Sequence, residues 1–264
     1  TLGAFMKYPK ESLPKKPTDH IVDKKYGFFQ SQKEFFVELA TELGLKPMRT
    51  GKDLAYQRHP LSFLVEAADD ICYTIIDFED GINLGLIEEE FALEYLIKLV
   101  KDSIDIKKYH SLQYKKDRVS YLRALAIGTL IQEAAAVFLE NEQAIMDGTY
   151  GVSLLEKCKY EAQINDILQL SISKIYNSTE VVEKEVAGYK ILADLLEVFV
   201  KAVNTTFEGT ASNYDALIFK LLPEELQETP DKLYDRILMV CSYIASMSDG
   251  YAIVLHKKIK GDLI

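Results

Sequence analysis

The segment RHPLSFLVEAADDICYTIIDFED, residues 58–80, determines the fold class of this chain. Pro60 fits the first turn of a helix, and apolar residues then recur at three- and four-residue spacing, which predicts a long amphipathic helix. Asp69, Tyr73 and Asp77 are spaced i, i+4 and i+8, so they share one face of that helix. Because a carboxylate on a partly buried helix is costly unless it is paired or bound to a metal, the spacing alone favours a functional site and a salt-bridge network equally.

Proline is concentrated near the start of the chain, and none occurs between Leu61 and Leu222. A long proline-free stretch is typical of long helices. The helix that starts at Pro60 is expected to end near Asp80, just before Gly81. Amphipathic spacing predicts further helices over residues 31–43, 88–101, 118–146, 154–176, 181–203, 214–222 and 231–260. No alternating strand pattern of useful length occurs, so the sequence predicts an all-α, multi-helix fold behind an extended lead-in.

Composition limits the classes of function. The net charge of −10 argues against a broad surface for nucleic acid or for an anionic membrane, because both would be repelled. No stretch of eighteen apolar residues is free of charges, so no transmembrane span is expected. Cys72, Cys158 and Cys241 form no C-x-x-C pair, which fits reduced, buried thiols and a cytoplasmic location.

The helix around Asp69 resembles the signature helix of bacterial dGTP triphosphohydrolases, HD-superfamily enzymes that release inorganic triphosphate from a deoxynucleoside triphosphate. Other stretches look similar to the same family, namely residues 7–9, 25–29, 181–189, 234–236 and 243–252. The resemblance covers nearly the whole chain. It implies an HD-type all-α fold of which this chain is the C-terminal part, with residues 1–110 completing the catalytic domain and residues 111–264 forming a helical region packed on it.

The resemblance implies a role for three residues of this helix. Asp69 would be the last ligand of the His…His-Asp…Asp metal site that names the superfamily. Tyr73 would pack beside the sugar and leave no room for a 2′-hydroxyl, and Asp77 would accept a hydrogen bond from the 3′-hydroxyl. The implied cofactor is a divalent metal ion, and carboxylate with imidazole suits Mg, Mn, Fe or Zn about equally.

The resemblance also assigns basic residues to the phosphates. Lys7 and Tyr8 would reach them, and Lys25 and Arg236 are weaker candidates for the same contact. The first histidine and the His-Asp dipeptide of the metal site should lie upstream of Lys7. None of the four histidines in this chain is followed by aspartate, so we expect that these ligands belong to a missing portion.

The implied partners are dGTP or another dNTP as substrate, further copies of the chain in a homo-oligomer such as a hexamer, and a nucleotide or single-stranded DNA as effector, with no membrane. The alternative is a catalytically inactive HD-family module for nucleotide sensing or assembly. An isoprenoid-synthase-like bundle needs D-D-x-x-D, and Tyr73 stands where the motif departs from that pattern. A di-iron bundle needs Glu-x-x-His, which is absent from the sequence. Base preference depends on pocket shape, so the sequence leaves it open.

Overall fold

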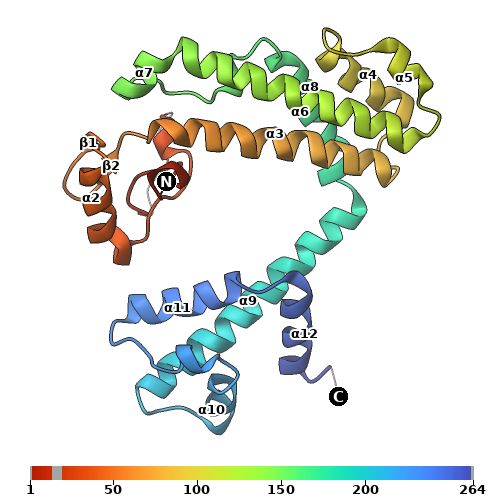
Figure 1. Cartoon of the computed structure of the whole chain (residues 1–264). Helices are drawn as coiled ribbons and strands as arrows, with labels where there is room; N and C mark the ends of the chain where they lie inside the picture. The colour runs from red at the N-terminus through yellow and green to blue at the C-terminus, as the bar shows by residue number, and fades with distance from the viewer. Residues whose placement is uncertain (1, 14–19, 263–264) are drawn as a thin grey trace. The chain divides into compact units, whose positions relative to one another are not determined.

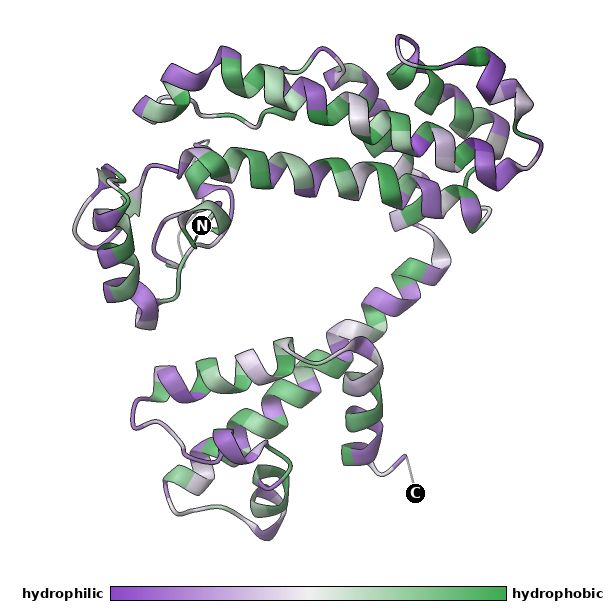
Figure 2. Ribbon diagram, viewed as in Figure 1, coloured by the Kyte–Doolittle hydropathy of each residue, from purple (hydrophilic) through white to green (hydrophobic). Residues whose placement is uncertain are grey.

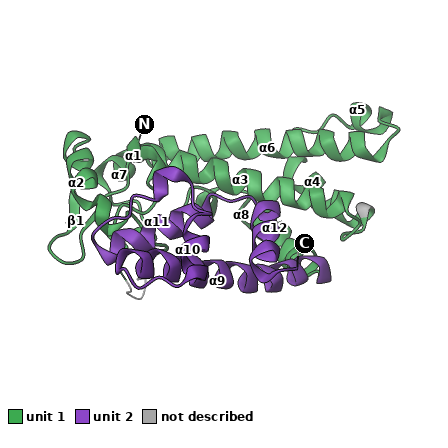
Figure 3. Ribbon diagram, turned by 90° about the horizontal axis from the view of Figure 1, so that it is seen from below, with its two compact units in different colours: residues 1–178 green, residues 179–264 purple. Residues whose placement is uncertain are grey.

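A computed structural model describes residues 2–13 and 20–262, so residues 14–19 of the lead-in lie outside the described residues. Within that part of the chain the structure contains twelve α-helices and one small two-stranded antiparallel sheet (Figure 1), which confirms the predicted all-α class. The chain divides into two compact units, residues 1–178 and residues 179–264 (Figure 3).

Unit 1 is built on two long helices that pack along each other, α3 and α6. Its helices and strands are α1 (Leu2–Phe5), α2 (Lys33–Glu42), β1 (Pro47–Arg49), β2 (Ala55–Tyr56), α3 (Pro60–Asn83), α4 (Glu89–Val100), α5 (Ile106–Ser111), α6 (Lys115–Glu140), α7 (Glu142–Asp147), α8 (Glu161–Ser171) and a π-helical turn (Ile172–Tyr176). Ile75, Phe78 and Ile82 of α3 and Leu122 and Leu130 of α6 are fully buried between these helices. Because α6 belongs to this core, the boundary expected at residue 110 falls inside unit 1.

Helix α3 begins where the sequence predicts and ends one turn later. The His59 ring accepts a hydrogen bond from the Leu61 amide at 3.2 Å, and Pro60 occupies the first turn. Gly81 does not end the helix. It lies inside α3 and lets the side chain of Ile175 approach so closely that a Cβ at this position would collide with it. The chain leaves the helix at Gly85, whose φ of +73° lies in the left-handed region that glycine tolerates.

Three of the predicted helices are interrupted. The one predicted over 154–176 is divided into a 3-10 turn (Leu155–Lys157) and α8, which continues into the π-helical turn. The helix predicted over 118–146 is divided at Asn141, whose side-chain amide donates to the Val137 carbonyl at 2.8 Å. The helix predicted over 231–260 is divided into α11 (Leu233–Ala245) and α12 (Asp249–Lys260), because the Ser248 hydroxyl accepts a hydrogen bond from the Tyr251 amide and caps a new helix. The sequence also missed α5 and the short β1–β2 sheet.

Unit 2 is a bundle around the longest helix, α9 (Thr179–Phe207), with α10 (Asn213–Phe219), α11 and α12 packed on it. Leu195, Phe199 and Val203 of α9 form its core together with Val240 of α11. The hydrophobic stripes that build both cores can be followed along the helices in Figure 2. Unit 2 thus has its own apolar centre.

Helix α6 is long and apolar enough to cross a membrane by length and composition alone, and α11 with α12 would pass the same test as a bent pair. One or two such helices are weak evidence for a membrane, because the core helix of a soluble protein has the same composition. Leu122, Ala126 and Leu130 of α6 are fully buried against the rest of unit 1. Packing within unit 1 therefore covers one stripe of α6, and 28% of its apolar window is buried.

Candidate functional site

Buried carboxylates anchor the lead-in segment ahead of α3. Glu11 accepts the Leu54 amide at 2.7 Å and pairs with Lys33 at 2.6 Å. Asp23 is held by both terminal nitrogens of Arg49, at 2.8 and 2.7 Å. Because a buried carboxylate needs such partners, these contacts fix the segment that brings α1 and the residues after it against α3.

The lead-in places a lysine on the face of α3 that the sequence selected. The ammonium of Lys7 lies 2.7 Å from Oδ2 of Asp69, whose side chain is 67% exposed. The hydrogen bond and charge of Lys7 lower the pKa of the Asp69 carboxyl, and the charge of Lys25 lowers it further. The structure thus brings together Lys7 and Asp69, which the resemblance assigned to phosphate and to metal.

A buried ion pair lies beneath this surface. Arg58, just before α3, donates to Glu66 at 2.9 Å, and its guanidinium lies over the Phe63 ring, 4.2 Å from the centroid. Tyr8 is also buried here. Burial, followed by the charge of Glu66, raises the pKa of the Tyr8 hydroxyl. The structure therefore places Tyr8 in the protein interior beside Lys7, and it adds Arg58 and Glu66, to which the sequence assigned no role.

An aromatic residue from a distant part of the chain contacts α3 one and two turns beyond Asp69. Tyr176, in the π-helical turn, donates its hydroxyl to Oδ2 of Asp77 at 2.7 Å. Its ring stacks on Tyr73, with centroids 5.7 Å apart and planes inclined by 25°. Burial, then hydrogen bonding to Tyr73 and Asp77, raises the pKa of Tyr176 far above its ordinary value. The sequence selected Tyr73 and Asp77 and missed Tyr176.

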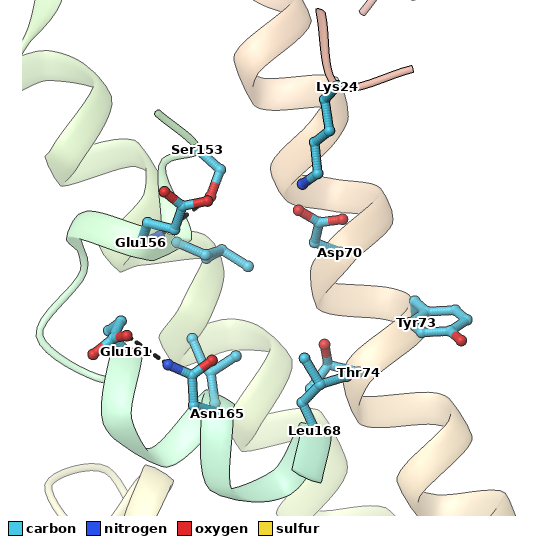
Figure 4. A pocket seen from close by; sticks show the side chains of 11 residues that line it. Lys24, Asp70, Tyr73, Thr74, Ser153, Glu156, Glu161, Asn165 and Leu168 are labelled. Carbon is cyan, nitrogen blue, oxygen red and sulfur yellow. Dashed lines mark hydrogen bonds between the residues drawn. The ribbon is translucent and has the colours of Figure 1, made fainter. Parts of the chain in front are cut away.

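A pocket of about 320 Å³ lies between α3 and α8, beside this row of residues (Figure 4). Lys24 reaches toward Asp70 at one end, and the ring of Tyr73 turns away from the other labelled side chains at the edge. Three carboxylates line the pocket, from Asp70, Glu156 and Glu161, against one cation from Lys24. Its lining is therefore acidic, unlike the surface around Lys7.

Replacing Asp70 by asparagine is expected to stabilise unit 1 at neutral pH. Burial, followed by the charge of Glu66, raises the pKa of the Asp70 carboxyl above 3.8, so the folded state disfavours the ionised form. Stability from this group is therefore present below the ordinary pKa and lost as the pH rises through the raised one. Thermal unfolding should show a higher Tm for Asp70→Asn at pH 7, with the difference vanishing below about pH 4. A pH-independent difference would contradict this explanation.

The described residues do not fit a complete metal site by themselves. Across residues 2–13 and 20–262, no three His, Cys, Asp or Glu side chains gather in a way that could hold a metal ion. Asp69 offers one exposed carboxylate, and its partner in the structure is an ammonium. A divalent ion needs several ligands, so Asp69 supplies at most one member of a larger set.

Arg236, a weaker candidate for the phosphates, lies buried in unit 2. Its guanidinium donates to the Asn204 side chain at 2.8 Å and to the carbonyls of Pro230 and Asp231 at 3.0 and 2.6 Å. It also lies 3.8 Å from the centroid of the Phe207 ring. These contacts tie the start of α11 to the end of α9, which is a structural role.

Comparison with known proteins identifies relatives along the whole chain. Residues 156–258 match a family described as the phosphohydrolase-associated domain. A deoxyguanosinetriphosphate triphosphohydrolase-like protein from Synechocystis sp. is 36% identical over 266 residues, which cover 99% of this chain and 59% of that protein. A protein of the same name from Listeria monocytogenes is 31% identical, with the same coverage. A Yersinia pestis protein named deoxyguanosinetriphosphate triphosphohydrolase is 23% identical over 98% of this chain.

The chain spans 59% of the length of the first two of these relatives. Its own sequence matches them almost from end to end, and the phosphohydrolase-associated domain accounts for most of unit 2 and the end of unit 1. Over almost its whole length the chain is similar to proteins named deoxyguanosinetriphosphate triphosphohydrolase-like, and its residues 156–258 match the phosphohydrolase-associated domain.

Proposed function

We propose that the full-length protein hydrolyses dGTP or other deoxynucleoside triphosphates to the deoxynucleoside and inorganic triphosphate, with the help of a divalent metal ion. The observation that carries this proposal is the row Asp69, Tyr73 and Asp77 along one face of α3, with Lys7 at 2.7 Å from the first of them. Successive members of this row are about 6 Å apart along the helix axis. Their order matches the order of phosphate, sugar ring and 3′-hydroxyl in a nucleotide.

The phosphate end of the substrate belongs at Asp69. In the proposal Asp69 is one ligand of a Mg, Mn, Fe or Zn ion whose other ligands come from outside the residues described. Such an ion would polarise the α-phosphoryl group or lower the pKa of a bound water. Lys7, with Lys25 nearby, supplies positive charge beside Asp69, where it offsets charge on the phosphate oxygens.

The electrostatics of the site support the same orientation. Asp70, Glu156 and Glu161 give the neighbouring pocket an excess of negative charge, which repels a triphosphate. Lys7, which pairs with Asp69, attracts it. Charge therefore orients the nucleotide with its phosphates at the Lys7 end and its uncharged sugar toward Tyr73.

Replacing Tyr73 by alanine is expected to relax discrimination against ribonucleotides. The Tyr73 ring is about half exposed, and in the proposal it occupies the space that a 2′-hydroxyl would need. The ratio of kcat/KM for dGTP to that for GTP should fall about tenfold to a hundredfold, the range over which a pocket rejects an added hydroxyl. Steady-state assays on the full-length protein measure this ratio.

Tyr73→Phe is the matched control, because it keeps the ring and removes only the hydroxyl. It should discriminate as the wild type does. An unchanged ratio in Tyr73→Ala would contradict the steric role of this ring.

The hydrolysis itself is tested by anion-exchange separation of the products formed from each dNTP with Mg²⁺ or Mn²⁺. Inorganic triphosphate is the expected product. If a metal-loaded full-length protein binds nucleotides without turnover, the inactive nucleotide-sensing module replaces this proposal. Assembly into a homo-oligomer under control of a nucleotide or single-stranded DNA is part of the same proposal, and size-exclusion chromatography with each effector tests it.

A further inference from the structure

Tyr176 makes two contacts with the residues that the proposed function assigns to the sugar. Its hydroxyl donates to Oδ2 of Asp77 at 2.7 Å, and its ring stacks on Tyr73 at 5.7 Å between centroids. These residues are 99 positions apart in the sequence, so the contact is made by tertiary packing and not by the helix itself. Tyr176 therefore contacts both of the protein residues that the proposed function assigns to the sugar.

The backbone around Tyr176 is shaped to make these contacts. Residues Ile172–Tyr176 form a π-helical turn, a rare conformation that is frequent at functional sites. One extra residue in a helical turn rotates the residues after it by about 100° around the axis. The turn is also pressed against α3, because Gly81 carries no Cβ and admits the side chain of Ile175. Gly81 lies one turn beyond Asp77, so this close approach brings Tyr176 to the carboxylate.

We propose that Tyr176 is a positioning residue of the deoxyribose site, which holds the Asp77 carboxylate so that its second oxygen accepts the 3′-hydroxyl of the substrate. This inference rests on the proposed function, since it concerns the sugar of the same nucleotide. A carboxylate has two oxygens and about four acceptor positions, so one hydrogen bond from Tyr176 leaves Oδ1 of Asp77 available.

The two contacts of Tyr176 have different roles in the recognition of the sugar. The hydroxyl of Tyr176 stays protonated throughout the physiological range, because burial and hydrogen bonding raise its pKa, so it is a permanent donor to Asp77. The stacked rings of Tyr73 and Tyr176 are too close for a sugar to enter between them. The sugar must therefore meet the open side of Tyr73, with Tyr176 backing that ring.

The test compares binding of 2′-deoxyguanosine and 2′,3′-dideoxyguanosine to the full-length protein by calorimetry, which requires no turnover. The wild type should bind the ligand with the 3′-hydroxyl about tenfold more tightly, as expected for a hydrogen bond to a charged group. Tyr176→Phe, which keeps the ring, should reduce this preference to about twofold, since the carboxylate is no longer held. Binding of the dideoxynucleoside should be unchanged. Asp77→Ala should abolish the preference, and adding Tyr176→Phe to it should have no further effect.

The matched control is Tyr160→Phe, which removes another tyrosine-to-aspartate hydrogen bond of unit 1, from Tyr160 to Asp102 at 3.3 Å. It should leave the 3′-hydroxyl preference intact. A preference that is preserved in Tyr176→Phe, or already lacking in the wild type, would overturn the inference. Tighter binding of deoxyguanosine by Tyr176→Phe would also overturn it, because Tyr176 would then compete with the sugar. Absence of triphosphate release with the expected binding pattern would instead refute only the proposed function.

Discussion

The variant Asp69→Ala is expected to lose triphosphohydrolase activity while it keeps its fold. Loss of a metal ligand should lower kcat/KM for dGTP by roughly a thousandfold or more, which equals about 4 kcal/mol of transition-state stabilisation. The fold should survive because the Asp69 side chain is largely exposed and its one ion pair, to Lys7, is partly solvated. Exposed pairs of this kind contribute about 0–1 kcal/mol to stability. Steady-state kinetics and thermal unfolding measure the two effects.

Asp80→Ala is the matched control for this variant. Asp80 is an exposed aspartate on the same helix, α3, and lies outside the row of site residues. Its removal should leave kcat/KM within about twofold of the wild type, as expected for a surface substitution. Full activity in Asp69→Ala would remove this residue from the metal site.

The second large effect concerns the buried ion pair at the start of α3. Glu66→Leu is expected to lower the free energy of unfolding by about 3–5 kcal/mol, because it leaves the charge of Arg58 buried without its partner. Both side chains are almost completely buried, and their nitrogen and oxygen lie 2.9 Å apart. Urea denaturation of the single variants measures this loss. Since single-domain stability is about 5–15 kcal/mol, the variant should be close to unfolding at 37 °C.

The double variant Arg58→Met/Glu66→Leu shows whether the loss of stability comes from the broken ion pair or from lost packing. Replacing both charges by apolar side chains removes the uncompensated charge, so the double variant should recover much of the stability that Glu66→Leu loses. If the two single losses simply add, the effect comes from packing around Phe63 and not from the ion pair.

The sequence predicted those site residues that lie on a single helix, α3. Pro60 sets the start of α3, and helical spacing places Asp69, Tyr73 and Asp77 on one face, so local pattern was sufficient. The contact of Lys7 with Asp69 joins the lead-in to this helix. These features need no knowledge of tertiary packing.

The residues that the sequence missed depend on packing between distant segments. Tyr176 reaches Asp77 across 99 residues, and no local pattern encodes that distance. Gly81 was interpreted as a helix stop, whereas it allows Ile175 to approach α3. Arg58 and Glu66 are eight residues apart, a spacing that gave no signal because the arginine precedes the helix. A glycine inside an amphipathic helix was the one available clue to close packing.

Helix breaks were missed for a different reason. The segment around Asn141 and the segment from Ser246 to Ser248 contain neither proline nor glycine, so the apolar periodicity runs through both. The signals present were weaker, an asparagine and a capping serine, and tertiary packing decided between continuing the helix and ending it.

The most direct test of the proposed chemistry is the fate of the attacking water oxygen. Full-length protein is incubated with dGTP and Mg²⁺ or Mn²⁺ in water enriched in oxygen-18, and the products are analysed by mass spectrometry. Attack at the α-phosphorus with cleavage of the bond to O5′ puts one labelled oxygen into inorganic triphosphate and none into deoxyguanosine, and this is the predicted result. Formation of deoxyguanosine monophosphate and pyrophosphate, or no product at all from metal-loaded protein, would contradict it.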